Sequence, residues 1–356
     1  MELLHEITKN YNFETREILK RLIDAHKALA ELKWVANTLP NKTILTNTLS
    51  LQEAKDSSAI ENIVTTQDEL YKSNVVSKQF ASMAAKEVYS YAEALKLGYE
   101  SVKKTGIITN NDILEIQGLI EQNNAGFRKL PGTELKNDKT GETVYTPPQN
   151  YNEIVSLMSD LETYINDNKN WMDPLINMAI MHHQFESIHP FYDGNGRTGR
   201  ILNVLYIVKE GLLETPILYL SRYINQHKSE YYKLLQSVRD ENGWERWIEF
   251  MLHAIEQTAK DTITIIENIK TTMLSHKQAI RSKLPKIYSQ DLLNNIFRHP
   301  YTKIEFITRD LWCTRKTATK YLEALVGIGI LVKYKVGRDS YYINKDLFEL
   351  LQNVSK

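Results

Sequence analysis

The feature that most constrains this chain is a twelve-residue loop set between two stretches of helical apolar spacing. Residues 189–200 read HPFYDGNGRTGR. Before the loop, residues 174–188 carry apolar side chains at helical intervals. Pro190 disfavours helical dihedrals at His189 and so ends this run. Helical spacing then resumes after the loop and stops at Gly211. The pattern predicts two packed helices joined by a glycine-rich turn.

The loop combines the side chains that the handling of a polyphosphate requires. His189 is a candidate general base, because imidazole titrates near neutral pH, and Asp193 offers a hard oxygen ligand for Mg²⁺. The start of the second helix leaves backbone N–H groups unpaired, and these attract phosphate. Arg197 and Arg200 lie three residues apart on one helix face. Two arginines near a helix start oppose the helix dipole unless an anion is present. We therefore expect an anionic ligand at this turn.

The string resembles the signature of the Fic family, HPFx(D/E)GNGRxxR, and every fixed position of that pattern is filled here. Family members typically transfer AMP from ATP to a hydroxyl of a target protein. The resemblance implies that His189 takes the proton from a Ser, Thr or Tyr hydroxyl, that Asp193 holds Mg²⁺ against the α- and β-phosphates, and that backbone and amide donors cradle phosphate. Arg200 would clamp the γ-phosphate. The implied ATP-binding residues are Glu61, Gly194, Asn195, Gly196, Arg197, Thr198, Gly199 and Arg200.

A second motif lies upstream of the loop. Residues 57–62 read SSAIEN, which resembles the family's inhibitory motif (S/T)xxxE(G/N), with Ser57, Glu61 and Asn62 at its fixed positions. The resemblance implies that Glu61 pairs with Arg200 and occupies the place of the γ-phosphate. ATP would then enter with its α-phosphate misaligned for attack. The same glutamate could support removal of AMP, so the direction of the reaction stays open.

Residues 126–149 lose helical spacing and gain turn residues. Residues 139–142 read as a hairpin turn, and residues 143–146 alternate like a short strand that ends at a Pro-Pro pair. An ordinary surface hairpin fits this pattern equally well. By resemblance, it is the flap that pairs with an extended segment of the target protein. Arg128, in the string GFR, is typical of the family, but neither the pattern nor the resemblance assigns it a role.

The predicted fold class is mainly α: a Fic-type helical bundle with a small β-hairpin flap, an N-terminal helical region and a C-terminal winged helix-turn-helix domain. The predicted parts are an N-terminal helical region at 1–106 carrying the inhibitory helix, the Fic catalytic domain at 107–255, a linking helix at 256–285 and the winged-helix-like domain at 286–356. The predicted helices include runs at roughly 12–36, 49–62, 77–103 and 245–282.

The C-terminal part shows three helical runs and then two strands around Gly337, an order that resembles a winged helix-turn-helix domain. Residues 286–345 could therefore contact DNA, although such domains also serve in dimer or partner contacts. The candidate contact residues are Arg315, Lys316, Thr319, Lys320 and, at the wing tip, Arg338.

Composition excludes several classes of protein. The chain has 44 basic and 44 acidic side chains, so its net charge does not indicate nucleic acid or membrane. No apolar run approaches the ~20 residues of a membrane span, and the first residues lack the features of a signal peptide. Cys313 is the single cysteine, which excludes an internal disulfide. We expect a cytoplasmic protein without membrane contact.

We expect an autoinhibited protein adenylyltransferase that uses ATP and Mg²⁺, modifies a target protein on the flap at 126–149 and also modifies itself. The open alternatives are a relative that removes AMP, a relative that transfers phosphate, and a DNA-binding regulator whose loop senses nucleotide. A homodimer is a further open possibility. A metal hydrolase built on His182, His183, Glu186 and His189 is disfavoured, because the spacing differs from that of zinc proteases. We expect His182 and His183 to pack or to form hydrogen bonds.

Overall fold

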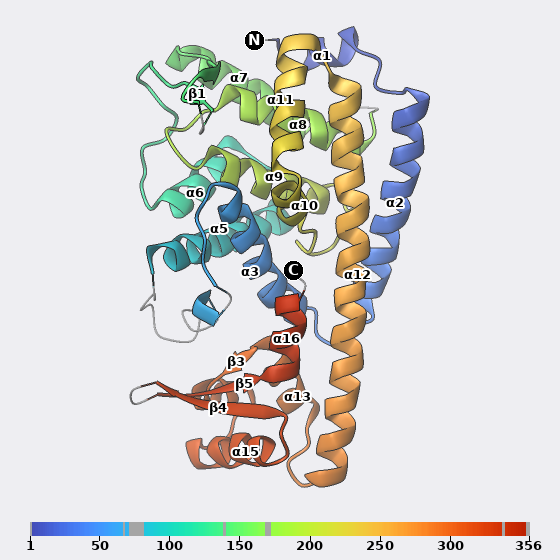
Figure 1. The fold of residues 1–356 in the computed structure, drawn as a ribbon, viewed down its shortest axis with the longest axis vertical. Coiled ribbons are helices and arrows are strands. Elements are labelled where there is room, and N and C mark those ends of the chain that lie inside the picture. The colour runs from blue at the N-terminus through green and yellow to red at the C-terminus, as the bar shows by residue number, and fades with distance from the viewer. Residues whose placement is uncertain are drawn as a thin grey trace.

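The computed structural model describes residues 2–66, 68–70, 82–137, 140–167, 172–336 and 339–353. These residues are mainly helical, with two small antiparallel sheets (Figure 1). The predicted mainly-α class is confirmed. Within the described part of the chain, no helix is both long and apolar enough to cross a membrane.

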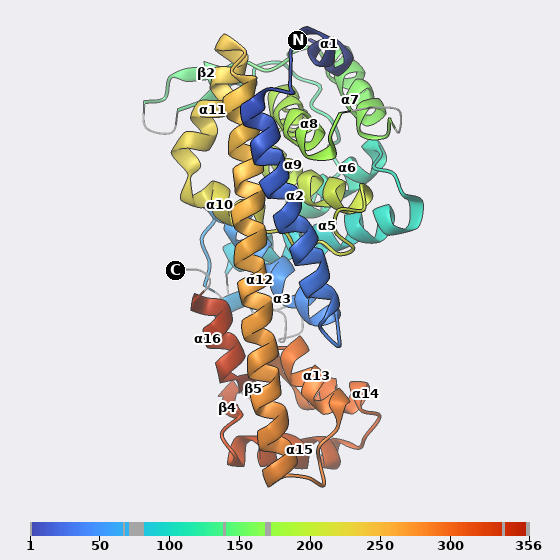
Figure 2. The ribbon, with the colours of Figure 1, turned by 90° about the vertical axis from the view of Figure 1, so that its right-hand side faces the viewer.

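Two long helices, α12 (Trp244–Lys283) and α2 (Arg16–Asn37), pack side by side along the long axis of the molecule. Helix α12 runs nearly its full length, and α2 lies beside it (Figure 2). Both helices are amphipathic and bury their apolar faces in the same core. The helix predicted at 245–282 is therefore confirmed, and it joins the upper bundle to the C-terminal part (Figure 1).

The prediction of one helix at 12–36 was wrong at its start. Thr15 caps α2 by accepting a hydrogen bond from the N–H of Ile18 at 3.3 Å, so the helix begins at Arg16. A separate seven-residue helix, α1 (Leu4–Asn10), precedes it. That helix is too short for its periodicity to be recognised in the sequence.

The central bundle surrounds a helix that is almost entirely buried. Every residue of α8 (Pro174–Ile188) from Leu175 onward is buried, and α9 (Asn195–Lys209) packs against it. Pro174 occupies the first turn of α8 and Asp173 caps it. The helices around this pair are α5 (Met83–Thr105), α6 (Asn110–Glu121), α7 (Tyr151–Ile165), α10 (Leu220–Gln226) and α11 (Lys228–Glu241). The predicted run at 77–103 begins later than expected, after the cap Ser82, and residues 77–81 lie outside the described residues.

Helix α3 (Thr43–Ile60) crosses the centre of the molecule, between the bundle and the C-terminal part (Figure 1). It begins six residues before the predicted start at 49. Its buried Glu53 accepts hydrogen bonds from the Tyr91 hydroxyl at 3.0 Å and from the backbone N–H and the hydroxyl of Ser221. At the other side, the Gln52 side chain donates to the carbonyl of Leu351 at 3.2 Å. Side chains of helix α3 thus form hydrogen bonds with both the helical bundle and the C-terminal part.

The flap contains two short strands, β1 (Leu135–Lys136) and β2 (Thr143–Tyr145), which pair antiparallel. The strand predicted at 143–146 is present, one residue shorter. Residues 138–139, which belong to the predicted turn, lie outside the described residues.

The C-terminal part has an order of elements consistent with a winged helix. Strands β3, β5 and β4 pair in that order. The three predicted helices and two predicted strands are present, whereas β3 and α16 were not predicted. The elements are α13 (Gln290–Arg298), β3 (Tyr301–Thr302), α14 (Ile304–Asp310), α15 (Arg315–Gly327), β4 (Leu331–Val336), β5 (Asp339–Asn344) and α16 (Lys345–Asn353).

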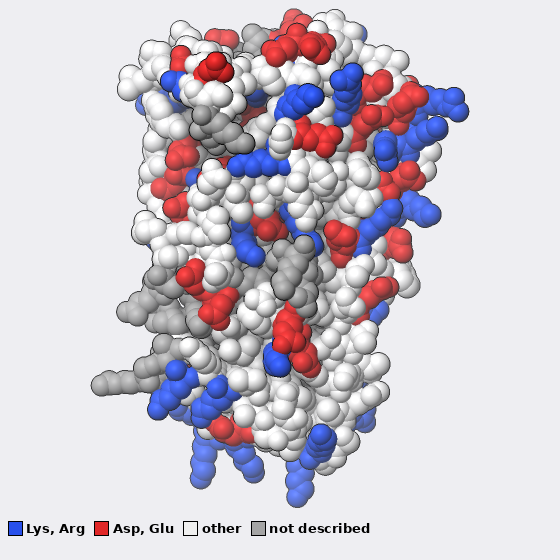
Figure 3. Space-filling model, viewed as in Figure 1, with Lys and Arg blue, Asp and Glu red and all other residues white. Residues whose placement is uncertain are grey.

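The candidate DNA-contact residues lie on α15. Arg315, Lys316 and Lys320 are exposed, and Thr319 is partly exposed. Figure 3 shows Lys and Arg side chains projecting at this end of the molecule. Gly337 and Arg338, predicted for the wing, lie outside the described residues.

Gly98 of α5 marks a tight helix contact that mutation can test. A Cβ at this position would lie 2.5 Å from Cδ1 of Leu205 and 2.9 Å from Cδ1 of Ile116. We expect Gly98→Val to destabilise the fold by roughly 1–3 kcal/mol through overpacking and to lower the thermal midpoint measured by circular dichroism. The matched control is Gly327→Val in α15, where no atom beyond the neighbouring residues and the backbone of its own helix lies within 4 Å of the new Cβ. Equal midpoints for the two variants would contradict the contact.

Candidate functional site

The loop between α8 and α9 adopts two left-handed backbone positions. His189 caps the C-terminus of α8 with φ 48° and ψ 58°, and Gly194 begins α9 with φ 77°. The side-chain amide of Asn195 accepts from the N–H of Phe191 at 2.8 Å and donates to its carbonyl at 2.9 Å. The amide that the resemblance assigned to phosphate is therefore used to hold the loop. Backbone N–H groups at the start of α9 are further candidates for holding phosphate.

At Gly196, in the first turn of α9, neighbouring side chains occupy the space that a side chain would need. A Cβ on Gly196 would lie 2.6 Å from Oε1 of Glu61 and 2.8 Å from Nη1 of Arg200. Helix α3 thus brings its acidic end directly over the first turn of α9. The predicted inhibitory motif and the predicted loop meet at this point in space.

Arg200 is almost fully buried and is held by the upstream motif. Its Nη2 donates to Oε1 of Glu61 at 2.7 Å, and its Nε donates to the hydroxyl of Ser57 at 2.8 Å. Nη2 also donates to the carbonyl of Ser57 at 3.0 Å. Burial on its own lowers the pKa of this guanidinium, but the Glu61 carboxylate outweighs it and raises the pKa above its usual value. Arg200 therefore remains a cation with a defined anionic partner.

Arg197 donates to three carboxylates, and its Nη2 lies 3.8 Å from Oδ1 of a fourth, Asp193. Its Nε donates to Oε2 of Glu61 at 2.8 Å, its Nη2 to Oε1 of Glu121 at 2.7 Å, and its Nη1 to Oε2 of Glu87 at 3.3 Å. Burial raises the pKa of Glu121. Glu87 of α5 and Glu121 of α6 were not identified from the sequence, because acids on amphipathic helices resemble ordinary solvated charges.

The backbone conformation explains why asparagine stands at the last position of the upstream motif. Glu61 follows the final helical residue of α3, and Asn62 has φ 65°, a left-handed value that asparagine tolerates. The N–H of Ile63 then bonds to the carbonyl of Ser58 at 3.0 Å, which closes the helix end. Asn62 therefore ends the helix at the point where Glu61 reaches Arg197 and Arg200.

Asp193 is suited to share a cation with a ligand. Its side chain is 75% exposed, and Oδ1 accepts the N–H of Gly194 at 2.7 Å. The described residues contain no group of three or more His, Cys, Asp or Glu that could enclose a metal. A single exposed carboxylate fits Mg²⁺, which keeps several waters and binds through one or two carboxylates together with phosphates.

His189 lies in a cationic environment. Burial, together with the nearby guanidinium groups of Arg128 and Arg239, lowers the pKa of its imidazole to about 4. The side chain is therefore neutral at pH 7 and able to accept a proton. Neither arginine was connected with His189 by the sequence.

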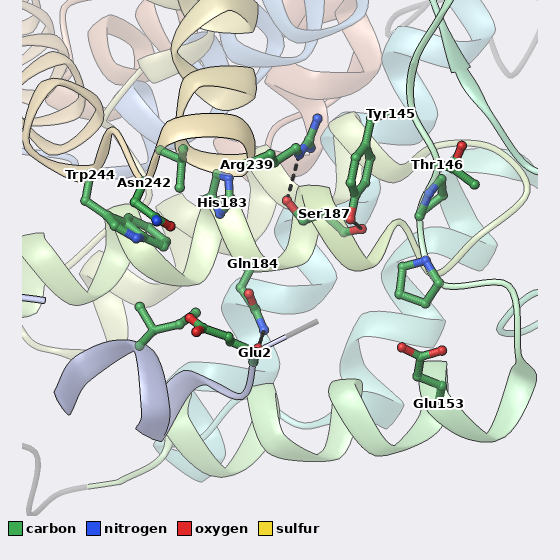
Figure 4. A pocket seen from close by; sticks show the side chains of 14 residues that line it. Glu2, Tyr145, Thr146, Glu153, His183, Gln184, Ser187, Arg239, Asn242 and Trp244 are labelled. Carbon is green, nitrogen blue, oxygen red and sulfur yellow. Dashed lines mark hydrogen bonds between the residues drawn. The ribbon is translucent and has the colours of Figure 1, made fainter. Parts of the chain in front are cut away.

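A cavity of about 460 Å³ lies beside the flap. Its walls come from the exit of β2, from α8 and from the region where α11 meets α12 (Figure 4). Arg239 and Tyr145 lie together at one side, above Ser187 (Figure 4). The cavity therefore borders both the flap and the segment that leads into His189.

His182 and His183, on α8, form hydrogen bonds and ring contacts in the interior of the bundle. His182 bonds through Nε2 to the hydroxyl of Tyr231 at 2.8 Å and stacks on Trp247. Nε2 of His183 lies 3.3 Å from the carbonyl of Leu235. The predicted packing and hydrogen-bonding roles are confirmed.

Three family models match successive parts of the chain. "Fic/DOC family N-terminal" matches residues 19–100, "Fic/DOC family" matches residues 107–207, and "Protein adenylyltransferase SoFic-like, C-terminal domain" matches residues 272–347. This chain belongs to the Fic/DOC family. The match covers the upstream motif and the loop that meet at Arg200.

Relatives and solved structures agree with the family. "Protein adenylyltransferase Fic" of Aedes aegypti is 28% identical over 158 residues, and that of Culex quinquefasciatus is 29% identical over 158 residues. Each alignment covers 44% of this chain and 30% or 29% of the relative. The chain thus spans less than a third of the length of these curated relatives.

Among solved structures, a Fic family protein from Desulfovibrio desulfuricans G20 matches with a TM-score of 0.59 at 19% identity, covering 94% of this chain and 97% of the other. Fic-1 (aa134–508) from C. elegans matches with a TM-score of 0.55 at 22% identity, covering 71% of this chain and 74% of the other. Both chains share the fold described above.

Proposed function

We propose that this Fic/DOC protein is an ATP- and Mg²⁺-dependent protein adenylyltransferase that Glu61 holds in an inhibited state. It transfers AMP to a Ser, Thr or Tyr hydroxyl of a target protein and of itself. The observation that carries the proposal is the carboxylate of Glu61, which bridges Arg197 and Arg200 at the start of α9. The names of the curated relatives support the same reaction class.

The positive charges that bind Glu61 would also bind a phosphate, which would compete with the Glu61 carboxylate for them. Two buried guanidinium groups beside a helix N-terminus require an anion, because burying an unpaired charge is costly. In the structure Glu61 supplies that anion. A γ-phosphate bound to Arg200 would have to displace it or bind in a shifted position, and the α-phosphate would then be misplaced for attack.

The residues of the loop divide the chemistry between them. Neutral His189 accepts the proton of the target hydroxyl as the oxygen attacks the α-phosphorus, and pyrophosphate leaves. Asp193 would hold Mg²⁺, which supplies charge neutralisation to the phosphates. Backbone N–H groups at the start of α9 and the two arginines position the triphosphate.

The flap provides a docking place for the target. Strands β1 and β2 form a two-stranded sheet, so their outer edges are available to an extended segment. The cavity beside Tyr145 offers space for a side chain next to the modified hydroxyl. Main-chain pairing accepts varied sequences, and the cavity adds selectivity.

Replacing Glu61 tests the inhibition. With ATP labelled at the α-phosphate, we expect Glu61→Gly to raise self-modification by about 10²-fold over wild type, because the triphosphate can then align. The double variant Glu61→Gly with His189→Ala should incorporate no label. Intact-mass measurement identifies the added group as AMP.

Other outcomes separate the alternatives. Retention of a γ-label would indicate phosphate transfer instead. Loss of AMP from a pre-modified protein would indicate removal. If neither label remains on the Glu61→Gly protein while duplex DNA binds in a salt-dependent way, the interpretation as a DNA-binding regulator replaces the enzyme.

The role of Asp193 is tested by metal dependence. In the Glu61→Gly protein, we expect chelation of Mg²⁺ to stop AMP transfer, and Asp193→Ala to require a several-fold higher Mg²⁺ concentration for half-maximal rate. Asp24→Ala, at an exposed position of α2, is the matched control. An unchanged Mg²⁺ requirement in Asp193→Ala would remove Asp193 from the metal site.

A further inference from the structure

The C-terminal end of α8 leaves four backbone carbonyls without partners inside the helix. All four accept hydrogen bonds from three side chains that we call the α8 cap: Arg128, Tyr145 and Arg239. The bonds are Arg239 Nη2 to Glu186 O at 3.3 Å, Tyr145 hydroxyl to Ser187 O at 3.1 Å, Arg128 Nη2 to Ile188 O at 3.4 Å and Arg128 Nε to His189 O at 2.8 Å.

The cap brings together three separate parts of the chain. Arg128 lies at the start of the flap, before strand β1, Tyr145 ends strand β2, and Arg239 belongs to α11. The guanidinium of Arg239 lies 4.0 Å from the centre of the Tyr145 ring (Figure 4). Arg128 also donates to the carbonyl of Pro148 at the flap exit. The cap therefore joins the flap to the residue that carries the candidate base.

Among the described residues, no carboxylate lies within ion-pair distance of either arginine of the α8 cap. Arg128 donates to backbone carbonyls, and Arg239 donates to the hydroxyl of Ser187 at 3.0 Å, to the side-chain oxygen of Gln236 at 3.2 Å and to a carbonyl. All of these acceptors are neutral. Burial lowers the pKa of both guanidinium groups, yet both remain cations at pH 7. Their charge acts on neighbouring groups, and His189 is one of them.

His189 needs support of this kind for two reasons. Its backbone is left-handed and precedes a proline, an arrangement that persists only where the surroundings hold it. Its position at a helix C-terminus would by itself favour the charged imidazolium. The bond from Arg128 to the His189 carbonyl holds the backbone, and the two guanidinium groups oppose protonation of the ring. Glu61, from the end of α3, acts in the opposite direction, and so does a hydrogen bond with the backbone of Glu186, the one acidic residue of α8.

We infer that Arg128 and Arg239 are positioning residues for AMP transfer: they cap α8 and keep His189 oriented and uncharged. This inference rests on the proposed function, in which His189 is the base. A general base must be neutral, so its activity is lost as pH falls through its pKa in the folded protein. A lowered pKa extends activity to lower pH, and removing a neighbouring cation must move the acidic limit of activity upward.

Arg239 is partly buried at the edge of the cavity, whereas Arg128 is fully buried. A substitution at Arg239 is therefore the one less disruptive to the fold. In the Glu61→Gly protein, we expect the rate of self-modification to change little between pH 7.5 and 5.5. Arg239→Gln should lose activity over that interval, by at most the roughly tenfold that a full return of the imidazole to its usual pKa of about 6.5 would give, because burial and Arg128 still lower this pKa. Arg239→Lys keeps the charge and should restore the profile of the parent. Arg281→Gln is the matched control, because Arg281 also lies over a tyrosine ring, that of Tyr288, but at the far end of α12.

Direct titration of the His189 imidazole by NMR, assigned with a His189→Gln protein, separates this inference from the function. We expect the pKa of the ring to rise in Arg239→Gln and in Arg128→Gln, but not in Arg239→Lys. If the Glu61→Gly parent transfers no AMP, the proposed function fails while the titration still decides the inference. Identical imidazole titrations in the parent and Arg239→Gln, in protein with an unchanged thermal midpoint, would overturn it.

Discussion

The bridge from Glu61 to Arg197 and Arg200 is the interaction on which the site depends. Both guanidinium groups are buried at the start of α9, where the helix dipole also favours negative charge. Leaving them without an anion would cost more than the pair gains over hydrophobic packing. The chain therefore supplies its own carboxylate, and the same requirement makes the site receptive to phosphate. The proposed inhibition and the proposed affinity for phosphate would both arise from this one arrangement of charge.

Helix α3 brings this carboxylate into place because it is fixed elsewhere. Glu53 is buried and accepts bonds from α5 and α10, and burial raises its pKa to about 7. Gln52 reaches the carbonyl of Leu351 in α16. Glu61 itself stands one residue beyond the last helical residue, so the helix ends where the contact with Arg197 and Arg200 begins. The family's upstream motif is in this way part of the packing between the two halves of the chain.

The apolar periodicity of the sequence was sufficient to predict the positions of the long helices. Helices α8, α9 and α12 were placed nearly at their observed bounds, because proline, glycine and apolar spacing agree there. The beginnings of α2 and α3 were misplaced by four and six residues, since a capping threonine or a buried polar helix leaves little periodic signal. Helix α1, strand β3 and helix α16 were missed. Short elements are stabilised by tertiary contacts rather than by their own pattern.

For the site, the sequence by itself identified the groups to which the proposed chemistry is assigned. His189, Asp193, Arg200 and Glu61 were identified because their motifs are contiguous, and the pairing of Glu61 with Arg200 followed from resemblance. Only the tertiary structure decided what surrounds them. Glu87 and Glu121 meet Arg197 from two other helices, and Arg128, Tyr145 and Arg239 cap α8 from three distant segments. Contacts of this kind depend on where separate elements cross in space, and a linear pattern of residues carries no record of those crossings.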